Sequence, residues 1–254
     1  GEGGDDRLFG DEGGDYLYGS DGADGIAGGT GNDLLNGGNG NDRVYGEDGN
    51  DTLYGDAGND SIGGGAGDDI IYGGTGNIYD DAGNNTIYGG AGNDTIYDGA
   101  GTSIVLGEDG NDRLFLFGTN SLALGGNGND HLNSDALEGV NTLSGGEGND
   151  YLYGNGGSVY LGGDNGDDFL RLGSGNGTLV GGEGNDSLYI AGGNGLLYGG
   201  NGNDNLSYHG GKATLRGGDG NDTLIGRADN AILFGENGND SLTGSVGQDI
   251  LFGG

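Results

Sequence analysis

The sequence predicts an all-β solenoid, and three observations lead to this prediction. A nine-residue unit repeats along the chain: residues 37–45 (GGNGNDRVY) are followed directly by GEDGNDTLY and GDAGNDSIG. Glycine makes up 72 of the 254 residues, and the chain has no proline. Each unit holds one aliphatic residue between two variable ones, which is typical of a three-residue strand with one inward side chain. Because a unit this small cannot bury a core alone, many units must stack.

The unit can be written G-G-x-G-(N/D)-D-x-U-x, where U is Leu, Ile or Val, and its residues are numbered here as positions 1 to 9. The glycines permit the positive φ values that a tight loop needs. The side chains at positions 5 and 6 offer oxygen atoms in that loop. The aliphatic residue at position 8 is predicted to point inward. Two units, and so two strands, are expected to complete one turn.

Composition excludes several other classes of protein. A collagen helix requires proline and a glycine period of three, and both are missing. An α-helix is disfavoured because each interior glycine costs about 1 kcal/mol. The net charge of −34 repels nucleic acid and anionic lipid, and no apolar run is long enough for a membrane span. The chain has no cysteine, so disulfides and thiolate metal sites are absent.

The position-6 aspartates fall into two columns if two units form one turn. Over residues 1–72 the repeat runs without a gap, and these aspartates are nine residues apart. We name the first set column A and the second column B, and expect them on opposite edges of a flattened coil. Column A begins with Asp6, Asp24, Asp42 and Asp60, and column B with Asp15, Asp33, Asp51 and Asp69.

The pattern changes after residue 72. The unit at residues 73–79 is two residues short and lacks its aspartate, so residues 73–88 are predicted to form an irregular turn. Column A then resumes with Asp94, Asp112, Asp130, Asp150, Asp168, Asp186, Asp204, Asp222 and Asp240. Column B instead holds Asn85, Ser103, Ser121, no clear counterpart, Val159, Gly177, Gly195, Ala213 and Ala231, before Asp249 restores it. We therefore predict a single roll over 1–254, with metal loops on both edges in 1–72 and mainly on one edge in 89–254.

The aliphatic position survives on both edges, so the coil is expected to continue where ligands are lost. After several column A aspartates the strand gains a second inward residue, as at Leu116, Leu172 and Ile190. Each large buried side chain contributes roughly 1.5–3 kcal/mol. Our hypothesis is that this apolar burial replaces cation binding there.

The loop chemistry predicts calcium. Carbonyl and carboxylate oxygens in a flexible loop suit a hard cation with six to eight ligands, which describes calcium better than magnesium. If each ion lies between two stacked turns, column A offers three sites among its first four aspartates and eight among its last nine, and column B offers three. The total is about 14 ions. Their charge nearly cancels the −34 of the chain.

The repeat resembles the RTX (repeats-in-toxin) nonapeptide, with about twenty units in register over essentially the whole chain. The resemblance implies a parallel β-roll (β-solenoid) of about 14 turns, roughly 65 Å long at ~4.8 Å per stacked strand. It also implies type I secretion from a Gram-negative bacterium, and folding in extracellular calcium. The same repeats occur in proteases, lipases, epimerases, surface-layer proteins and adhesins.

We expect a calcium-dependent structural or adhesive segment of a larger secreted or cell-surface protein, without catalysis, that self-associates into a fibre or lattice. The alternative is the secretion and folding module of an enzyme whose catalytic domain lies elsewhere. His131 and His209 are predicted to be surface residues, since no catalytic triad or histidine cluster accompanies them. The tyrosines after the inward aliphatic should point outward. Either these rings pack against one another across strands, or they form a contact surface for a neighbouring roll or a carbohydrate. A flat ice-binding surface is disfavoured.

Overall fold

The computed structural model describes residues 1–254 except 59, 68, 75, 83 and 228–229. The chain forms two compact units, residues 1–124 and 125–254. The single-roll organisation and its internal boundaries stay a prediction. The described part of the chain contains no helix that could cross a membrane.

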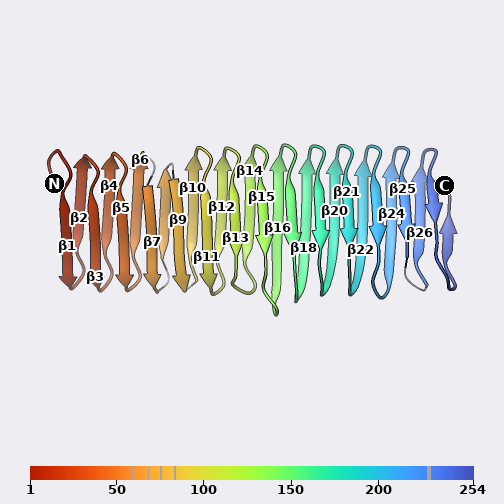
Figure 1. The fold of residues 1–254 in the computed structure, drawn as a ribbon, viewed down its shortest axis with the longest axis horizontal. Coiled ribbons are helices and arrows are strands. Elements are labelled where there is room, and N and C mark those ends of the chain that lie inside the picture. Colours follow the sequence, from red (N-terminus) through yellow and green to blue (C-terminus); the bar gives the residue numbers. More distant parts are fainter. Residues whose placement is uncertain (59, 68, 75, 83, 228–229) are drawn as a thin grey trace. The chain divides into compact units, whose positions relative to one another are not determined.

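In the first unit, odd-numbered and even-numbered strands form separate parallel sheets (Figure 1). The odd strands are β1 (Arg7–Glu12), β3 (Gly25–Thr30), β5 (Arg43–Asp48), β7 (Asp60–Ala66), β9 (Gly76–Ala82), β11 (Thr95–Ala100) and β13 (Arg113–Leu116). The even strands are β2 (Tyr16–Asp21), β4 (Leu34–Asn39), β6 (Thr52–Ala57), β8 (Ile70–Gly74), β10 (Thr86–Ala91) and β12 (Ile104–Asp109). Strand β14 (Leu122–Asn127) begins in this unit and ends in the second.

The second unit repeats this arrangement. Its odd strands are β15 (His131–Ser134), β17 (Tyr151–Gly154), β19 (Phe169–Leu172), β21 (Ser187–Ile190), β23 (Asn205–Tyr208), β25 (Thr223–Gly226) and β27 (Ser241–Thr243). Its even strands are β16 (Val140–Glu147), β18 (Ser158–Asn165), β20 (Asn176–Glu183), β22 (Asn194–Asn201), β24 (Ala213–Asp219), β26 (Ile232–Asn237) and β28 (Ile250–Phe252). The predicted all-β fold, a parallel β-roll with two strands per turn, is confirmed.

The predicted strand length of three residues is wrong for most strands. Most strands of the first unit have six residues, because they continue through positions 1 to 3 of the next repeat. Asp11, at position 2, pairs with Gly29, and Glu12 pairs with Thr30. The backbone pairing thus extends through residues that sequence analysis assigned to the loop alone.

The core is a stack of position-8 aliphatic side chains. In the odd sheet of the first unit Ile26 pairs with Val44 and Val44 with Ile62, and all three are at most 1% exposed. In the even sheet Leu35 pairs with Leu53 in the same way. Each such side chain removes apolar surface from water, which makes this stack the main metal-independent source of stability.

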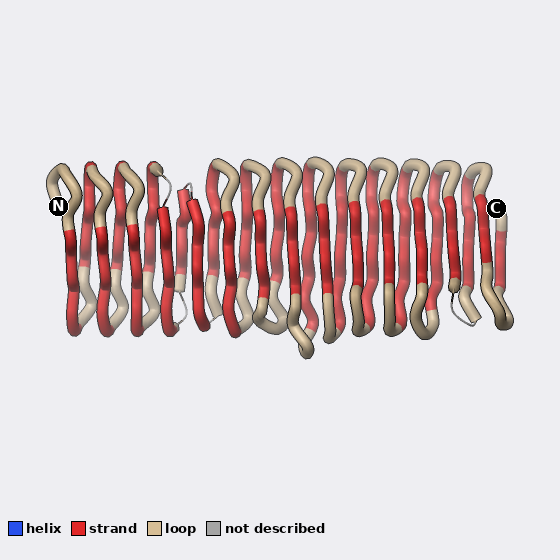
Figure 2. The backbone as a smooth tube through the Cα atoms, in the orientation of Figure 1, coloured by secondary structure: helices blue, strands red, loops and turns tan. Residues whose placement is uncertain are grey.

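Length changes in the repeat are absorbed outside this stack. Ile62 pairs with Ile78 across a step of sixteen residues, and Leu132 pairs with Leu152 across a step of twenty. The extra residues of the second case lie in the loop between β15 and β16, which extends past its neighbours in Figure 2. Of the predicted irregular turn, residues 75 and 83 lie outside the described residues.

The outward tyrosines stack on one another along the sheets. The Tyr54 and Tyr72 ring centroids are 4.7 Å apart and those of Tyr72 and Tyr88 are 4.9 Å apart, with planes within 7° of parallel. Each ring face is therefore covered by the next ring. This confirms the cross-strand packing interpretation, and it leaves few open ring faces in this stack for a sugar. His131 and His209 likewise contact tyrosine rings on the outside, as predicted.

Candidate metal centre

The position-6 aspartates are held by backbone hydrogen bonds that run along each edge. Column A aspartates lie at the starts of odd strands and column B aspartates at the starts of even strands; each directly precedes its strand except Asp60, the first residue of β7. In most of them Oδ1 accepts the N–H of the equivalent residue one turn earlier. Asp42 Oδ1 lies 2.8 Å from the nitrogen of Asp24, and Asp186 Oδ1 lies 2.8 Å from that of Asp168. One oxygen of each carboxylate therefore ties two turns together without any ion.

The other carboxylate oxygen, Oδ2, is buried and has no hydrogen-bond partner among the described residues. This holds in both columns of the first unit and in column A of the second: Asp15, Asp24, Asp33, Asp42, Asp51, Asp60, Asp150, Asp168, Asp186, Asp204 and Asp222. Of the remaining predicted ligands, Asp69, Asp94, Asp112 and Asp130 are buried, and Asp6 and Asp240 are half-buried. A buried carboxylate oxygen without a partner is costly, so a row of them fits a set of cation ligands.

At many position-1 glycines, Oδ2 and a carbonyl oxygen of the next turn lie close to the same point, where a Cβ would stand. On Gly89, at position 1, the point where a Cβ would stand is 2.9 Å from Asp94 Oδ2 and 2.7 Å from the carbonyl oxygen of Gly107 in the next turn. Gly37 shows the same approach to Asp42 Oδ2 at 2.5 Å. Any side chain at position 1 would fill this space. Glycine there lets two acceptor oxygens converge, which is unfavourable unless a cation lies between or beside them.

Positions 2 and 4 turn further carbonyl groups toward the neighbouring turn. Gly22, Gly40 and Gly58 at position 4 have φ near 140°, and a Cβ on Gly40 would collide with the carbonyl oxygen of Gly22. Position 2 also has positive φ, even in non-glycine residues such as Ser20 and Glu47. The loop thus presents several main-chain oxygens within one short segment, as a calcium loop requires.

Burial makes several of these carboxylates hard to ionise. In those, desolvation raises the pKa, the backbone N–H that the carboxylate accepts opposes the rise, and neighbouring carboxylates add to it. The pKa is raised to about 7 for Asp150 and Asp186, and to about 6 for Asp51, Asp60, Asp168 and Asp204. A cation bound beside these carboxylates would favour their ionised form.

Carboxylates alone do not complete a site. Within the described residues no three His, Cys, Asp or Glu side chains lie together as a metal cluster. A transition-metal centre of imidazole or thiolate ligands is thus not offered by those residues, while one carboxylate oxygen plus several carbonyl oxygens suits a hard divalent cation. The residues present fit calcium.

The position-5 side chains form a hydrogen-bond ladder of their own. Asn185 Oδ1 accepts the backbone N–H of Asn203 at 3.0 Å, and Asn203 Oδ1 accepts that of Asn221 at 2.8 Å. In this exposed ladder each side-chain oxygen accepts the N–H of the next turn, whereas an aspartate Oδ1 accepts the N–H of the previous turn. Position 5 therefore supplies backbone hydrogen bonds to the next turn, and the expectation that it supplies metal ligands gains no support from these contacts.

Column B keeps its backbone hydrogen bonds after it loses its aspartates. Asn85 Oδ1 accepts the N–H of Asp69 at 2.7 Å, and Ser103 Oγ accepts that of Asn85 at 3.2 Å. The member that sequence analysis could not find is Asn141, which pairs with Val159 and donates to Ser134 Oγ. The two-residue insertion before it hid it from a count in steps of nine.

Further along, apolar side chains fill the column B edge. Leu172 and Ile190, at position 1, are fully buried, while position 6 becomes Gly177 and Gly195. The predicted inward placement of both side chains is confirmed. At the next turn Tyr208 is also fully buried, and its hydroxyl donates to the carbonyl oxygen of Gly193 at 2.6 Å.

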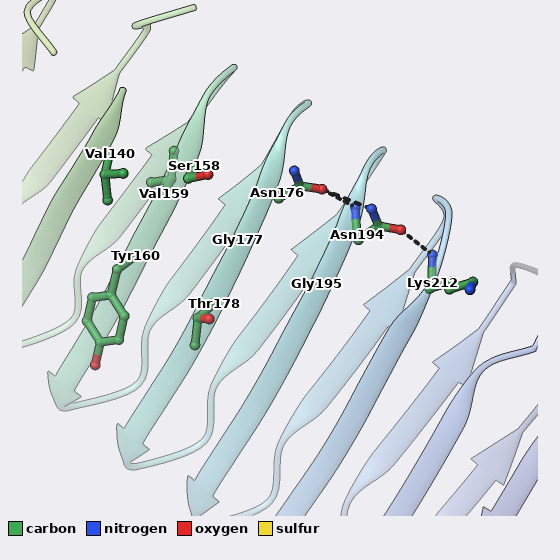
Figure 3. A pocket seen from close by; sticks show the side chains of 10 residues that line it. All are labelled: Val140, Ser158, Val159, Tyr160, Asn176, Gly177, Thr178, Asn194, Gly195 and Lys212. Carbon is green, nitrogen blue, oxygen red and sulfur yellow. Dashed lines mark hydrogen bonds between the residues drawn. The ribbon is translucent and has the colours of Figure 1, made fainter. Parts of the chain in front are cut away.

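A groove of about 530 Å³ lies over this apolar edge, on strands β16 to β22 (Figure 3). Gly177 and Gly195 line it with backbone atoms alone, because a Cβ on either would point inward, toward Leu172 or Ile190. Asn176, Asn194 and Lys212 form one row, joined by hydrogen bonds from the amide of Asn194 to Asn176 Oδ1 and from the Lys212 N–H to Asn194 Oδ1.

Comparison with protein families decides the identity of the repeat. The family model described as RTX calcium-binding nonapeptide repeat (4 copies) matches nearly the whole chain, at residues 1–35, 18–53, 28–62, 45–77, 78–115, 124–161, 135–170, 162–197, 171–206, 207–230 and 226–254. The chain belongs to the RTX calcium-binding nonapeptide repeat family. No curated protein matches the chain. The RTX assignment confirms the predicted family and calcium-binding repeats, while the individual aspartate ligands and the number of ions stay predictions.

Proposed function

We propose that this RTX chain is a segment of a larger secreted or cell-surface bacterial protein and that it folds when it meets extracellular calcium. Its role is structural or adhesive, it performs no catalysis, and type I secretion carries it out of the cell. RTX repeats are typical of secreted bacterial proteins. The observation that carries the proposal is the row of buried Oδ2 atoms that have no hydrogen-bond partner among the described residues. Several of them approach the same position-1 point as a carbonyl oxygen of the next turn.

The dependence of folding on calcium follows from the charge of the chain and the burial of its carboxylates. A net charge of −34 makes the compact state self-repulsive, and each buried carboxylate adds a desolvation cost. Bound calcium supplies the positive charge that offsets both costs, so that binding free energy becomes folding free energy. The residues prepare the loop: Oδ1 fixes each carboxylate against the previous turn, and position-1 glycine keeps the space beside Oδ2 open. Extracellular calcium modules bind at about 10⁻⁴–10⁻³ M, well above cytosolic calcium.

The test is to measure particle size and secondary structure in chelator and then in about 5 mM calcium, with magnesium at the same concentration as a control. Light scattering and circular dichroism should show an expanded, disordered chain in chelator and in magnesium, and a compact β-rich particle in calcium. A chain that gives the same size and spectrum in all three solutions would refute the proposal.

Negative-stain microscopy of the same samples tests self-association. Filaments or sheets that form only in calcium would support assembly into a fibre or lattice. Discrete monomers at all protein concentrations would contradict that part and leave a folding module that serves the rest of a larger protein.

A surface-ligand function is favoured by the groove over the apolar edge of the second unit. Its amide row offers hydrogen-bond donors, Tyr160 is 39% exposed beside it, and its glycine floor admits a flat ring. These groups suit a neutral oligosaccharide, since the charge of the chain disfavours an anionic one. A glycan array should then show binding that Tyr160→Ala and Thr178→Tyr abolish and that Tyr18→Ala, outside the groove, leaves intact. Absence of binding to every neutral glycan by the unaltered chain would overturn this second function.

A further inference from the structure

Positions 1 and 6 of a repeat compete for one interior space. At Gly37 the Asp42 carboxylate enters it from position 6, and at Gly154 the Val159 side chain does so, with Cγ1 2.8 Å from the point where a Cβ on Gly154 would stand. In the later turns Leu172 enters from position 1 against Gly177. A side chain from either position therefore reaches the same place.

The loop at residues 98–103 combines the two arrangements. Position 1 is Asp98 and position 6 is Ser103, so the carboxylate stands where glycine stands in an ordinary calcium loop. Asp98 is 1% exposed. Its Oδ2 is buried and has no hydrogen-bond partner among the described residues.

Ser103 performs the other half of the usual aspartate role. Its Oγ accepts the backbone N–H of Asn85 at 3.2 Å, as an aspartate Oδ1 does elsewhere. Its side chain is also hydrogen-bonded to the Asp98 carboxylate, which leaves Oδ2 as the oxygen without a partner. Together Asp98 and Ser103 reproduce what a single position-6 aspartate provides: an acceptor for the previous turn and a buried carboxylate oxygen.

Main-chain oxygens of this loop lie against the following turn, where the Gly101 carbonyl accepts the Thr119 N–H at 2.8 Å and keeps a second lone pair. The point where a Cβ on Gly118 would stand is 2.5 Å from the carbonyl oxygen of Gly101 and 3.1 Å from that of Gly99. Positions 2 and 4 of this loop thus still direct carbonyl groups toward the following turn. No ion pair within the described residues involves Asp98, so no side chain there neutralises it.

We propose that the loop at residues 98–103 is a further calcium site, in which Asp98 supplies from position 1 the carboxylate ligand that position 6 supplies elsewhere. The inference rests on the proposed calcium-dependent folding. It extends ion binding on the column B edge beyond Asp69, into turns where loss of the position-6 aspartate indicated none. The ligand class is a hard divalent cation bound by one carboxylate and several carbonyl oxygens.

The test is to count bound calcium by native mass spectrometry of the full chain. Asp98→Asn should bind one ion fewer than the unaltered chain. Asp98→Leu should do the same while keeping the space filled, because the next turn of the chain carries Leu116 and Ser121 at the equivalent positions. The double variant Asp98→Gly/Ser103→Asp rebuilds an ordinary loop and should recover the lost ion. Glu138→Gln, an exposed charge in another loop, is the matched control and should not change the count.

The outcomes separate this inference from the proposed function. A chain that binds no calcium at all refutes both. A chain that binds calcium, with the same count in Asp98→Leu as in the unaltered protein, refutes the new site and makes Asp98 a buried structural carboxyl group. If Asp98→Asn fails to fold, Asp98→Leu and the double variant still decide the question, since both fill the interior space.

Discussion

Leu172 and Gly177 fit together as a side chain and its missing counterpart: Leu172 Cδ2 lies 2.8 Å from the point where a Cβ on Gly177 would stand. One turn earlier the relationship is reversed, because Val159 Cγ1 lies 2.8 Å from the corresponding point on Gly154. The same space is thus filled from opposite ends of the loop in adjacent turns. Where calcium loops hold a carboxylate in this space, these turns hold a hydrocarbon side chain, which stabilises the edge without an ion.

This complementarity predicts a rescue by exchange. Gly177→Val should overpack the edge and cost about 1–3 kcal/mol. Leu172→Gly should leave a cavity and cost about 2–5 kcal/mol. The double variant Leu172→Gly/Gly177→Val copies the Gly154 and Val159 arrangement and should be more stable than either single variant. Urea unfolding in saturating calcium measures all three, and strictly additive losses in the double variant would contradict the shared space.

The hypothesis that apolar burial replaces ions on this edge makes a separate prediction. The double variant Leu172→Ser/Ile190→Ser removes two fully buried side chains and leaves polar groups in the core. The melting temperature should fall by several degrees in saturating calcium, because calcium cannot compensate where no ligands remain. Leu196→Ser, which alters a residue beside the buried Leu197, is the matched control and should change the melting temperature little. An unchanged melting temperature in the double variant would contradict the hypothesis.

The repeat predicted the fold because every unit repeats the same local choices. Glycine at positions 1, 2 and 4, an aspartate at position 6 and an aliphatic at position 8 together define the loop and the inward stack. The step of sixteen between Ile62 and Ile78 and the step of twenty between Leu132 and Leu152 preserve this stack, so the fold was insensitive to the two irregular repeats.

The details of the edges could not be predicted in the same way. Asn141 occupies the column B position after an insertion, and only strand pairing reveals it. The role of Asp98 depends on a contact with Ser103 five residues away, which a search for position-6 aspartates does not examine. The position-5 ladder was missed because an asparagine oxygen serves equally as a metal ligand or as a backbone acceptor, and the choice depends on where the next turn lies.

Replacing one column A carboxylate should change stability in opposite directions with and without calcium. In Asp186→Asn the amide oxygen still accepts the Asp168 N–H, as Asn85 does for Asp69. The new amide nitrogen would face the Gly199 carbonyl oxygen, which lies beside Asp186 Oδ2. In chelator, where a buried charge is removed, the variant should therefore keep more β structure by circular dichroism than the unaltered chain. In calcium, where a ligand is lost, its melting temperature should fall.

Asp167→Asn is the control for this experiment. Asp167 is exposed at position 5, and its Oδ1 accepts the Asn185 N–H, which an amide oxygen can also do. In calcium the free energy of unfolding should change by less than about 0.5 kcal/mol, and in chelator the β content should match that of the unaltered chain. If Asp186→Asn destabilised the protein equally with and without calcium, the carboxylate would have a structural role only.

The raised pKa values predict that acid stabilises the calcium-free fold. The folded-state pKa is about 7 for Asp150 and Asp186 and about 6 for Asp51 and Asp60, against an ordinary value of 3.8 that applies to the unfolded chain. Between these values the folded state binds protons more tightly than the unfolded state, so its free energy of unfolding rises as the pH falls. This contribution is complete below pH 3.8 and is lost as the pH rises through 6 to 7.

Circular dichroism of calcium-free protein should therefore show more β structure at pH 5 than at pH 8, while saturating calcium should reduce the difference because it competes with protons for the same oxygens. The variant Asp150→Asn/Asp186→Asn separates the buried groups from general charge repulsion. With two of the titrating carboxylates replaced by neutral amides, the part of the profile between pH 6 and 8 should flatten. If the β content of that variant changed with pH as steeply as in the unaltered chain, the acid effect would be due to surface charge. If the calcium-free chain instead lost β structure steadily from pH 8 to 5, the result would contradict the burial of these carboxylates.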